Sequence, residues 1–359
     1  MNKFRWGFLS TAQIGRKNWN AILNSGNSVV TAVASRDAAK AEQFLHDCQP
    51  TMPFERRPVA LGSYEALIES REVDAIYVPL PTGLRKEWVL RAAAAGKHVL
   101  CEKPCAVSAA DLREMITACE KHGVQFMDGV MFMHNGRLPA IRSALNDGKS
   151  VGEIRRIMSV FSFQSDQRDF RGNIRVQASL EPAGCLGDLG WYCIRMALFA
   201  MRWQMPREVS GRILSRAADA DVPTQFSGEL IFDGDASAGF YCSFLAESQQ
   251  WFTVSGARGS LHLPDFVHPF NTYEPTFEVN QIEHRLKAPA GSKIPADAVA
   301  LRDSGHAIAQ DTTMIRNFVT QARSGSLNTE WPEIALKTQI VMDACLASAR
   351  CDGETKRIF

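Results

Sequence analysis

Residues 1–128 alternate short apolar runs with segments of helical periodicity, and this alternation limits the possible folds more than any other feature. Short, continuously apolar runs are typical of parallel strands buried on both faces. The runs cover residues 4–9, 29–34, 74–78, 98–101 and 125–127. Apolar residues at helical spacing cover 11–24, 37–45, 87–95 and 111–122. The alternation predicts an N-terminal α/β domain built on a doubly wound parallel sheet.

The turn after the first strand is the expected phosphate-binding site. A Rossmann fingerprint, Gly-x-Gly-x-x-Gly, would fall on residues 10–15, where only the third glycine, Gly15, is present. Small side chains at 10–12 still let the backbone approach a pyrophosphate, and the following helix N-terminus supplies amide donors. An ordinary tight turn is the alternative. The residues expected to bind a dinucleotide here are Ser10, Thr11, Ala12, Gln13 and Ile14.

The end of the second strand indicates which dinucleotide binds. An NAD enzyme places an acidic residue there, on the ribose, whereas this chain has Ser35 and Arg36. A hydroxyl and a guanidinium suit a 2′-phosphate, which arginine can bind through two hydrogen bonds. Asp37 follows, and we interpret it as the cap of the next helix. The sequence favours NADP over NAD, with a solvated Arg36 as the alternative.

A charged group also ends the strand at 98–101, which is followed by Glu102-Lys103-Pro104. A lysine at the carboxyl end of a strand points into the crevice where open α/β sheets bind ligands. Pro104 fixes the turn, in either the cis or the trans form. The pattern predicts an amine held at the mouth of the nucleotide-binding domain; the alternative is a surface lysine.

From Gly129 the pattern changes to segments of alternating polarity, at 153–163, 226–232, 237–245, 251–255 and 260–263. Asp233-Gly234 and Arg258-Gly259 are turn signals between them. This predicts an α+β domain over residues 129–305 with a large, open, mainly antiparallel sheet. The uncovered face of such a sheet favours a homodimer or homotetramer.

A glycine-rich turn within the second domain opens a helix near residue 187. Asp188 and Tyr192 are four residues apart and would share one face of that helix. A carboxylate and a phenol on one face can point at a common ligand. The alternative is a capping aspartate and a half-buried core tyrosine.

Charge and cysteine content exclude several classes of function. The net charge is +1, charged residues make up 22%, and no basic stripe is visible, so we expect no nucleic-acid or membrane partner. No apolar run reaches the roughly 20 residues that span a bilayer, and no signal peptide is visible. The nine cysteines include no Cys-x-x-Cys pair, which favours free thiols in the cytoplasm. We find no metal-ligand spacing and expect no metal.

Taken together, these motifs resemble those of the Gfo/Idh/MocA oxidoreductases over nearly the whole chain. The resemblance rests on residues 6–15, on Glu102-Lys103-Pro104 and on residues 187–192. Tyr192 is similar to the tyrosine of the glucose–fructose oxidoreductase and dimeric dihydrodiol dehydrogenase branch. The resemblance implies NADP-dependent hydride transfer to or from a sugar, polyol or related cyclic alcohol or carbonyl. It also implies that the C-terminal helices, within 306–359, pack back on the first domain.

The resemblance further implies roles for individual residues. Tyr192 would be the acid–base catalyst beside Lys103, and Asp188 would orient substrate hydroxyls. Arg85 stands where many members have a histidine, which favours an anionic substrate group. Further cofactor contacts are expected at Pro81, Thr82, Glu102 and Lys103, and weaker substrate contacts at Asn135 and Arg175. Two alternatives stay open: a non-catalytic sugar- or NAD(P)-sensing protein, and a sugar–sugar oxidoreductase with tightly bound NADP.

Overall fold

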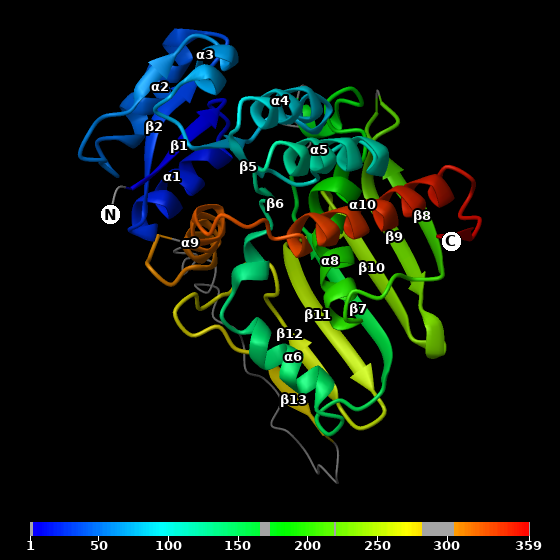
Figure 1. Cartoon of the computed structure of the whole chain (residues 1–359). Coiled ribbons are helices and arrows are strands. Elements are labelled where there is room, and N and C mark those ends of the chain that lie inside the picture. Colours follow the sequence, from blue (N-terminus) through cyan, green and yellow to red (C-terminus); the bar gives the residue numbers. More distant parts are fainter. Residues whose placement is uncertain (1–2, 166–172, 219, 282–304, 359) are drawn as a thin grey trace. The chain divides into compact units, whose positions relative to one another are not determined.

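The computed structural model describes residues 3–165, 173–218, 220–281 and 305–358. The chain forms two compact units (Figure 1). Unit 1 comprises residues 1–134 and 304–339, and unit 2 comprises residues 135–303 and 340–359. The boundary near the C-terminus falls inside helix α10 (Glu330–Ala349).

Unit 1 contains a six-stranded sheet in the order β3-β2-β1-β4-β5-β6, with every pair of neighbours parallel. The strands are β1 (Phe4–Leu9), β2 (Ser28–Ala34), β3 (Val59–Leu61), β4 (Ala75–Val78), β5 (His98–Cys101) and β6 (Phe126–Asp128). The helices between them are α1 (Ile14–Ser25), α2 (Ala38–Cys48), α3 (Tyr64–Glu69), α4 (Thr82–Ala94) and α5 (Ala109–Lys121). The predicted doubly wound parallel sheet is confirmed.

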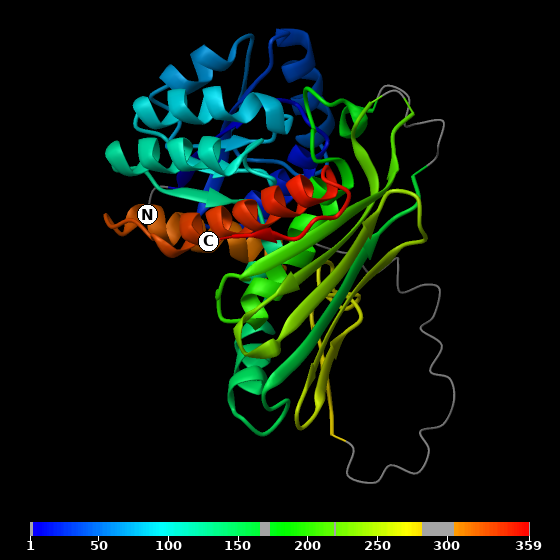
Figure 2. The ribbon, with the colours of Figure 1, turned by 90° about the vertical axis from the view of Figure 1, so that its right-hand side faces the viewer.

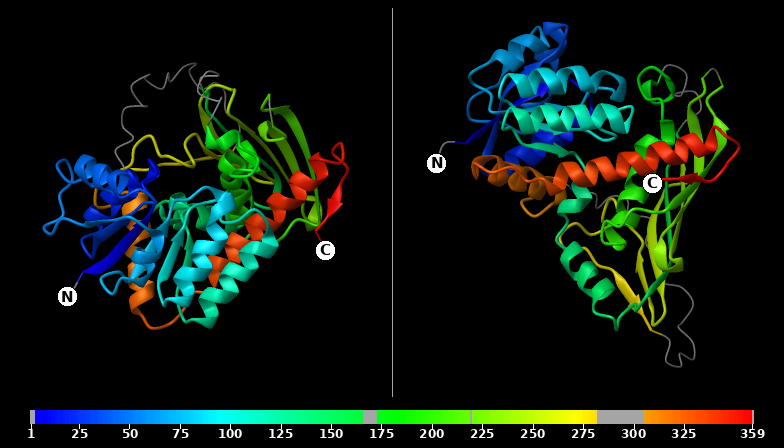
Figure 3. Two further views of the ribbon diagram at one scale, coloured as in Figure 1. Left: turned by 90° about the horizontal axis from the view of Figure 1, so that it is seen from above. Right: turned by 45° about the vertical axis from the view of Figure 1, so that its right-hand side comes forward.

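Side-chain caps fix where several of these helices begin. Asp37 accepts a hydrogen bond from Ala39 N at 2.9 Å, which confirms its predicted role as the cap of α2. Ser63 and Ser108 cap α3 and α5 in the same way. Helix α1 has no side-chain cap. Figure 3 shows α4 and α5, which pack side by side.

The third fingerprint glycine, Gly15, packs closely against aromatic side chains of unit 1. A Cβ atom on Gly15 would lie 3.2 Å from the Phe44 ring and 3.5 Å from the Phe8 ring. Both rings belong to the core of unit 1. The shorter contact is with the ring on α2, so a side chain at position 15 would require Phe44 to shift.

The C-terminal part of unit 1 completes its core. Helix α9 (Gln310–Arg323) packs on α1, and Lys17 pairs with the buried Asp311 at 2.9 Å. The rings of Trp6 and Phe318 lie 5.0 Å apart. Just before α10, Asn328 exchanges hydrogen bonds of 2.7 and 3.0 Å with the Gln125 side chain.

Unit 2 is built on an eight-stranded sheet in the order β13-β12-β11-β7-β10-β9-β8-β14. Its neighbours pair antiparallel except β7 and β10, which are parallel. The strands are β7 (Ile154–Ser162), β8 (Glu208–Arg216), β9 (Pro223–Ile231), β10 (Ser237–Ser243), β11 (Gln249–Gly256), β12 (Ser260–Leu263), β13 (Glu278–Asn280) and β14 (Lys356–Arg357). The predicted, mainly antiparallel sheet is confirmed.

Figure 2 shows α6 (Leu138–Asn146) and α8 (Trp191–Ala200) on the same side of this sheet. Helix α8 packs on β7 and β10, and all of its residues are buried. The last turns of α10 lie against β8, where Gly211 N donates to Ser348 Oγ at 3.0 Å. None of the helices within the described ranges combines the length and the apolar character that crossing a bilayer requires.

Candidate active site

The carboxyl ends of the strands in unit 1 bring the predicted cofactor residues together. Leu9 pairs with Ala34 in the parallel register of β1 and β2, so Ser10 and Ser35 leave the sheet side by side. The strand order reverses between β1 and β4, because β2 and β3 lie on one side and β5 and β6 on the other. Open α/β sheets bind their ligands at this switch point.

The first turn at this edge is shaped to receive an anion. Ser10 has φ 143°, in the region that favours glycine, and its Oγ accepts a hydrogen bond from Ala12 N at 3.2 Å. The side chains of Gln13 and Ile14 are exposed. Helix α1 has neither a side-chain cap nor an acidic residue in its first turn. A helix start of this kind attracts anions. Two of its first amides, Gly15 N and Arg16 N, already donate to the carbonyls of Ala12 and Gln13, at 2.8 and 3.1 Å.

Ser35 and Arg36 follow β2 at the same edge. Ser35 is buried, and its Oγ accepts from Asp37 N at 3.3 Å. Arg36 is exposed and lies near the Tyr64 hydroxyl. Burial raises the pKa of Tyr64, and the positive charge of Arg36 opposes that rise. The carboxylate of Asp37, the residue after Arg36, caps α2 and is therefore already bound by its own helix.

Glu102 belongs to a buried hydrogen-bond chain behind the end of β5. Asn18 Nδ2 donates to the Tyr77 hydroxyl at 2.7 Å, and that hydroxyl donates to Glu102 Oε1 at 2.7 Å. Burial and the nearby Glu102 raise the pKa of Tyr77 well above its usual value, so the phenol stays a donor. Glu102 thus orders the interior of unit 1, a role that the sequence did not indicate; its predicted cofactor contact stays a prediction.

Lys103 is half-buried, and its peptide bond to Pro104 is cis, one of the two forms that the sequence left open. The residues on either side of it, Glu102 and Pro104, are bound through their carbonyls by a side chain of the first turn of α4. Arg85 is buried and donates to the carbonyls of Leu80 and Glu102, at 2.7 and 2.9 Å, and to that of Pro104. The Nε and Nη1 atoms of the guanidinium therefore serve three carbonyls, and the predicted contact of Arg85 with an anionic substrate group stays a prediction.

The remaining cofactor candidates lie in the same region. Pro81 occupies the position just before α4. Thr82 is buried, and its Oγ1 donates a long hydrogen bond of 3.5 Å to the Pro104 carbonyl. Two residues of the first turn of α4, Thr82 and Arg85, therefore meet at one carbonyl beside Lys103.

In unit 2, Asp188 and Arg175 come together as an ion pair. Arg175 Nε donates to Asp188 Oδ2 at 2.8 Å, and Asp188 raises the pKa of Arg175. The first residues of α8 bring Tyr192 to the same part of the unit, where it is 7% exposed and meets the Phe161 ring edge-on at 5.4 Å. A carboxylate, a guanidinium and a phenol thus cluster around the start of α8.

The local helix differs from the predicted regular one. Residues Leu186–Gly190, which include Asp188, form a π-helical turn, and α8 follows directly. A Cβ atom on Gly190 would lie 2.8 Å from the end of the Leu186 side chain and 3.3 Å from the sulfur of Cys242, so glycine lets this turn pack closely against β10. Such π turns are frequent at functional sites.

Asn135 and Arg137 show a role that the sequence reasoning missed. The buried Asn135 accepts from Arg137 N at 3.0 Å. The Arg137 guanidinium is buried and binds Asp265 at 2.6 Å as well as the carbonyls of Asp265 and Thr276. The partners are 128 residues apart, and no local pattern connects them. The predicted substrate contact of Asn135 stays a prediction.

Lys103 belongs to unit 1, whereas Asp188 and Tyr192 belong to unit 2. The residues predicted to form one catalytic site therefore come from both units. The convergence of Lys103 and Tyr192 on one reacting carbon stays a prediction.

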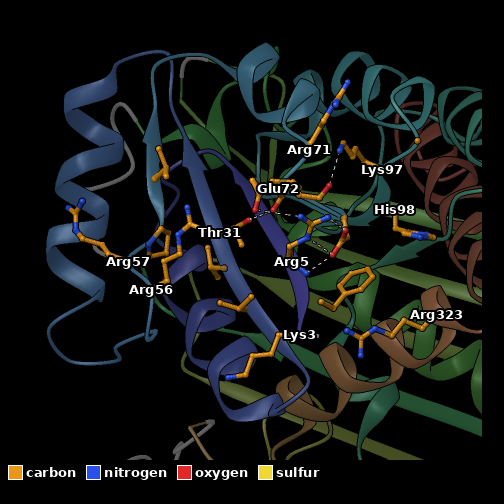
Figure 4. Close-up of a pocket in the computed structure, with 18 residues that line it drawn as sticks. Lys3, Arg5, Thr31, Arg56, Arg57, Arg71, Glu72, Lys97, His98 and Arg323 are labelled. Atoms are coloured by element: carbon orange, nitrogen blue, oxygen red, sulfur yellow. Dashed lines mark hydrogen bonds and ion pairs between the residues drawn. The ribbon is translucent and has the colours of Figure 1, made fainter. Parts of the chain in front are cut away.

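A cavity of about 980 Å³ opens at the other edge of the unit 1 sheet, where the strands begin (Figure 4). Its lining includes seven cations: Lys3, Arg5, Arg56, Arg57, Arg71, Lys97 and Arg323. The two that are partly buried are satisfied locally, since Arg5 pairs with Asp74 at 2.7 Å and Lys97 donates to two backbone carbonyls. The other five are exposed. None of the predicted site residues lines this cavity, and we do not assign the active site to it.

Comparison with known proteins gives family matches for both units. Residues 4–130 match the model of an oxidoreductase family with an NAD-binding Rossmann fold, and residues 140–262 match the GFO/IDH/MocA C-terminal domain. The chain is 32% identical to D-xylose 1-dehydrogenase (NADP(+)) 2 of Haloferax volcanii, over 76% of this chain and 78% of that one. It is 30% identical to trans-1,2-dihydrobenzene-1,2-diol dehydrogenase of Macaca fascicularis, over 72% and 74%.

Solved structures are similar over almost the entire length. KijD10, a 3-ketoreductase from Actinomadura kijaniata solved with NADP and TDP-benzene, superposes with a TM-score of 0.80 and 27% identity. The match covers 97% of this chain and 98% of KijD10.

Proposed function

The chain belongs to the Gfo/Idh/MocA oxidoreductase family, and we propose that it is an NADP-dependent oxidoreductase acting on a sugar, polyol or related cyclic alcohol or carbonyl. The support comes from relatives that are named as an NADP(+) sugar dehydrogenase, a diol dehydrogenase and a 3-ketoreductase. It also comes from the residues at the carboxyl ends of the strands of unit 1. The observation that carries the proposal is the side-by-side exit of Ser10 and Ser35 at the switch point, next to an uncapped helix.

The residues at this edge fit the dinucleotide. Ser10, Thr11 and Ala12 would hold the pyrophosphate with the first amides of α1, and Gln13 and Ile14 lie at the same turn. Ser35 and Arg36 would bind the 2′-phosphate. When bound, the nicotinamide of NADP supplies the hydride acceptor or donor.

The protein's own contribution is proton transfer and orientation. Tyr192 takes the proton from the substrate hydroxyl in oxidation and returns it in reduction. A phenol titrates near pH 10, so a tyrosine base needs about 4 kcal/mol of phenolate stabilisation to work near neutrality. One ammonium at about 4 Å supplies roughly 4 kcal/mol at an effective dielectric of 20, which is the role we assign to Lys103. Asp188, held by Arg175, orients substrate hydroxyls.

A panel of sugars, inositols and diols with NADP and NAD, followed at the nicotinamide absorbance, tests the proposal. We expect turnover with at least one member and a preference for NADP. Turnover with none, while NADP binding is retained, would instead favour the sugar-sensing alternative. Reduced-nicotinamide absorbance in the purified protein before any cofactor is added would favour a tightly bound cofactor and sugar–sugar transfer.

We also propose a cytoplasmic homodimer or homotetramer formed through the sheet of unit 2. All nine cysteines are free thiols and eight of them are buried, as a reducing compartment allows. Molecular mass in solution tests the oligomer, and a monomer at working concentration would exclude it.

A further inference from the structure

We propose that Arg85 is a positioning residue for Lys103: it fixes the backbone on both sides of the lysine and so sets where the amine is presented. The inference rests on the catalytic role proposed above for Lys103. It concerns a side chain for which the sequence reasoning predicted a substrate contact.

The hydrogen bonds of Arg85 bracket Lys103. Its Nη1 atom donates to the carbonyl of Glu102, one residue before the lysine, at 2.9 Å, and also to that of Pro104, one residue after it. Its Nε atom donates to the Leu80 carbonyl at 2.7 Å. One planar group therefore ties the segment after β5 to the segment after β4, with the peptides of Lys103 between its two acceptors.

Arg85 occupies a position that is otherwise unfavourable for a cation, which indicates that its hydrogen bonds to the carbonyls stabilise it there. It lies in the first turn of α4, where a cation is disfavoured by the helix dipole. It is also buried, 5% exposed, which is unfavourable for a charge without partners. Both costs are offset by the carbonyl groups that it binds, because buried carbonyls need donors as much as the guanidinium needs acceptors.

A lysine at position 85 would not reproduce this arrangement. The guanidinium offers five donors in a fixed plane, whereas an ammonium is a point charge on a flexible stem. Arg85→Lys keeps the positive charge and loses the geometry. A displacement of a catalytic group by about 1 Å lowers turnover by up to roughly 100-fold. Substrate affinity, by contrast, does not depend on the position of the amine in this proposal.

The first experiment is a double-mutant cycle of Arg85→Lys with Lys103→Ala, using whichever sugar or diol gives turnover in the panel. We expect Arg85→Lys alone to lower kcat about 10- to 100-fold with little change in KM or in NADPH affinity. In the Lys103→Ala background it should lower kcat no further, because the group that it positions is gone. An equal loss in both backgrounds, or a raised KM with unchanged kcat, would overturn the proposal.

Arg91→Lys is the matched control. Arg91 lies on the same helix but is partly exposed and pairs with Glu65 and Glu87. We expect normal kcat in this variant. If Lys103→Ala is fully active, the catalytic role of Lys103 fails, and that outcome is distinct from a failure of the Arg85 inference.

A second measurement needs no substrate. Reductive methylation with ¹³C-formaldehyde labels the lysines, and the resonance missing in Lys103→Arg identifies Lys103. In Arg85→Lys we expect this resonance to shift or broaden, whereas in Arg91→Lys it stays in place. An unchanged resonance in Arg85→Lys would overturn the proposal even if the panel yields no turnover.

Discussion

Arg36→Ala should reduce the preference for NADP over NAD. Arg36 is the exposed cation at the carboxyl end of β2, adjacent to the turn at Ser10. A hydrogen bond to a charged group contributes about 1.5–3 kcal/mol. Because Arg36 is exposed and screened by salt, we take the lower end, about 1.5 kcal/mol, which corresponds to roughly tenfold in affinity.

The measurement is the dissociation constant of NADPH and of NADH, by quenching of protein fluorescence, at two salt concentrations. NADPH should bind about tenfold more weakly to the variant, and NADH equally well. The difference should shrink at high salt, because a surface contact between opposite charges is screened. Arg36→Lys keeps the charge without the planar fork and should give an intermediate loss.

Tyr64→Phe is the control for this experiment, because it removes the neighbouring hydroxyl, whose pKa Arg36 lowers, and leaves the cation in place. We expect the preference for NADPH to survive in Tyr64→Phe. If the ratio of the two affinities is the same in Arg36→Ala as in the wild type, the assignment of Arg36 to the 2′-phosphate is refuted.

Three further outcomes are expected. Lys103→Ala and Tyr192→Phe should each lower turnover by about 10²- to 10⁴-fold with NADPH still bound, and near-normal rates in both would remove their proposed roles. Arg137→Met leaves the buried Asp265 carboxylate without its cation and should lower the free energy of unfolding by about 3–5 kcal/mol in urea titrations. Adding Asp265→Leu should recover only part of this loss, because the carbonyls of Asp265 and Thr276 and the Phe270 N–H also lose partners; no recovery would contradict the buried pair. Burial lowers the pKa of His98, whose Nδ1 accepts from Gln125 N, so the unfolded chain takes up the proton more readily. The stability from neutral His98 is complete above the unfolded pKa of about 6.5 and is lost as pH falls through it toward the lower folded pKa. His98→Gln keeps an acceptor without titrating and should flatten that part of the pH–stability curve; a curve identical to that of the wild type would argue against it.

The sequence indicated the parts of the fold that follow from local periodicity. Apolar runs and helical spacing located most strands and helices of unit 1, and a capping residue located the start of α2. Strand β3 and helix α3 were missed because they are short, three and six residues, and β3 lies at the edge of its sheet. In unit 2, β8 was missed, and the parallel pairing of β7 with β10 cannot be inferred from hairpin signals.

Helix α4 shows a different limit. The sequence predicted its start at residue 87, whereas it begins at Thr82. The first turn has buried polar side chains, Thr82 and Arg85, whose partners are the carbonyl of Leu80, just before the helix, and that of Pro104, after β5. Helix prediction from periodicity requires apolar residues on the buried face, so a first turn with a polar buried face is predicted as loop. The π-helical turn at Asp188 was not predicted either, because the spacing argument assumed a regular α-helix with 3.6 residues per turn.

The same limit applies to charged residues at the proposed site. A sequence places a charge at a strand end or helix start, but it does not say whether its partner is a ligand or the protein itself. Glu102, Arg85 and Arg137 are buried, with partners that come from their own unit. Ser10 and Arg36 are not buried, and they lie at the uncapped helix and the open end of β2. Among these five residues, burial with satisfied partners separates those that build the site from those proposed to meet the cofactor. Ser35 does not follow this pattern, because it is buried and is proposed to bind the 2′-phosphate. The half-buried Lys103 is set between two carbonyls that Arg85 holds, and the Arg85–Lys103 cycle tests whether those bonds determine the position of its amine.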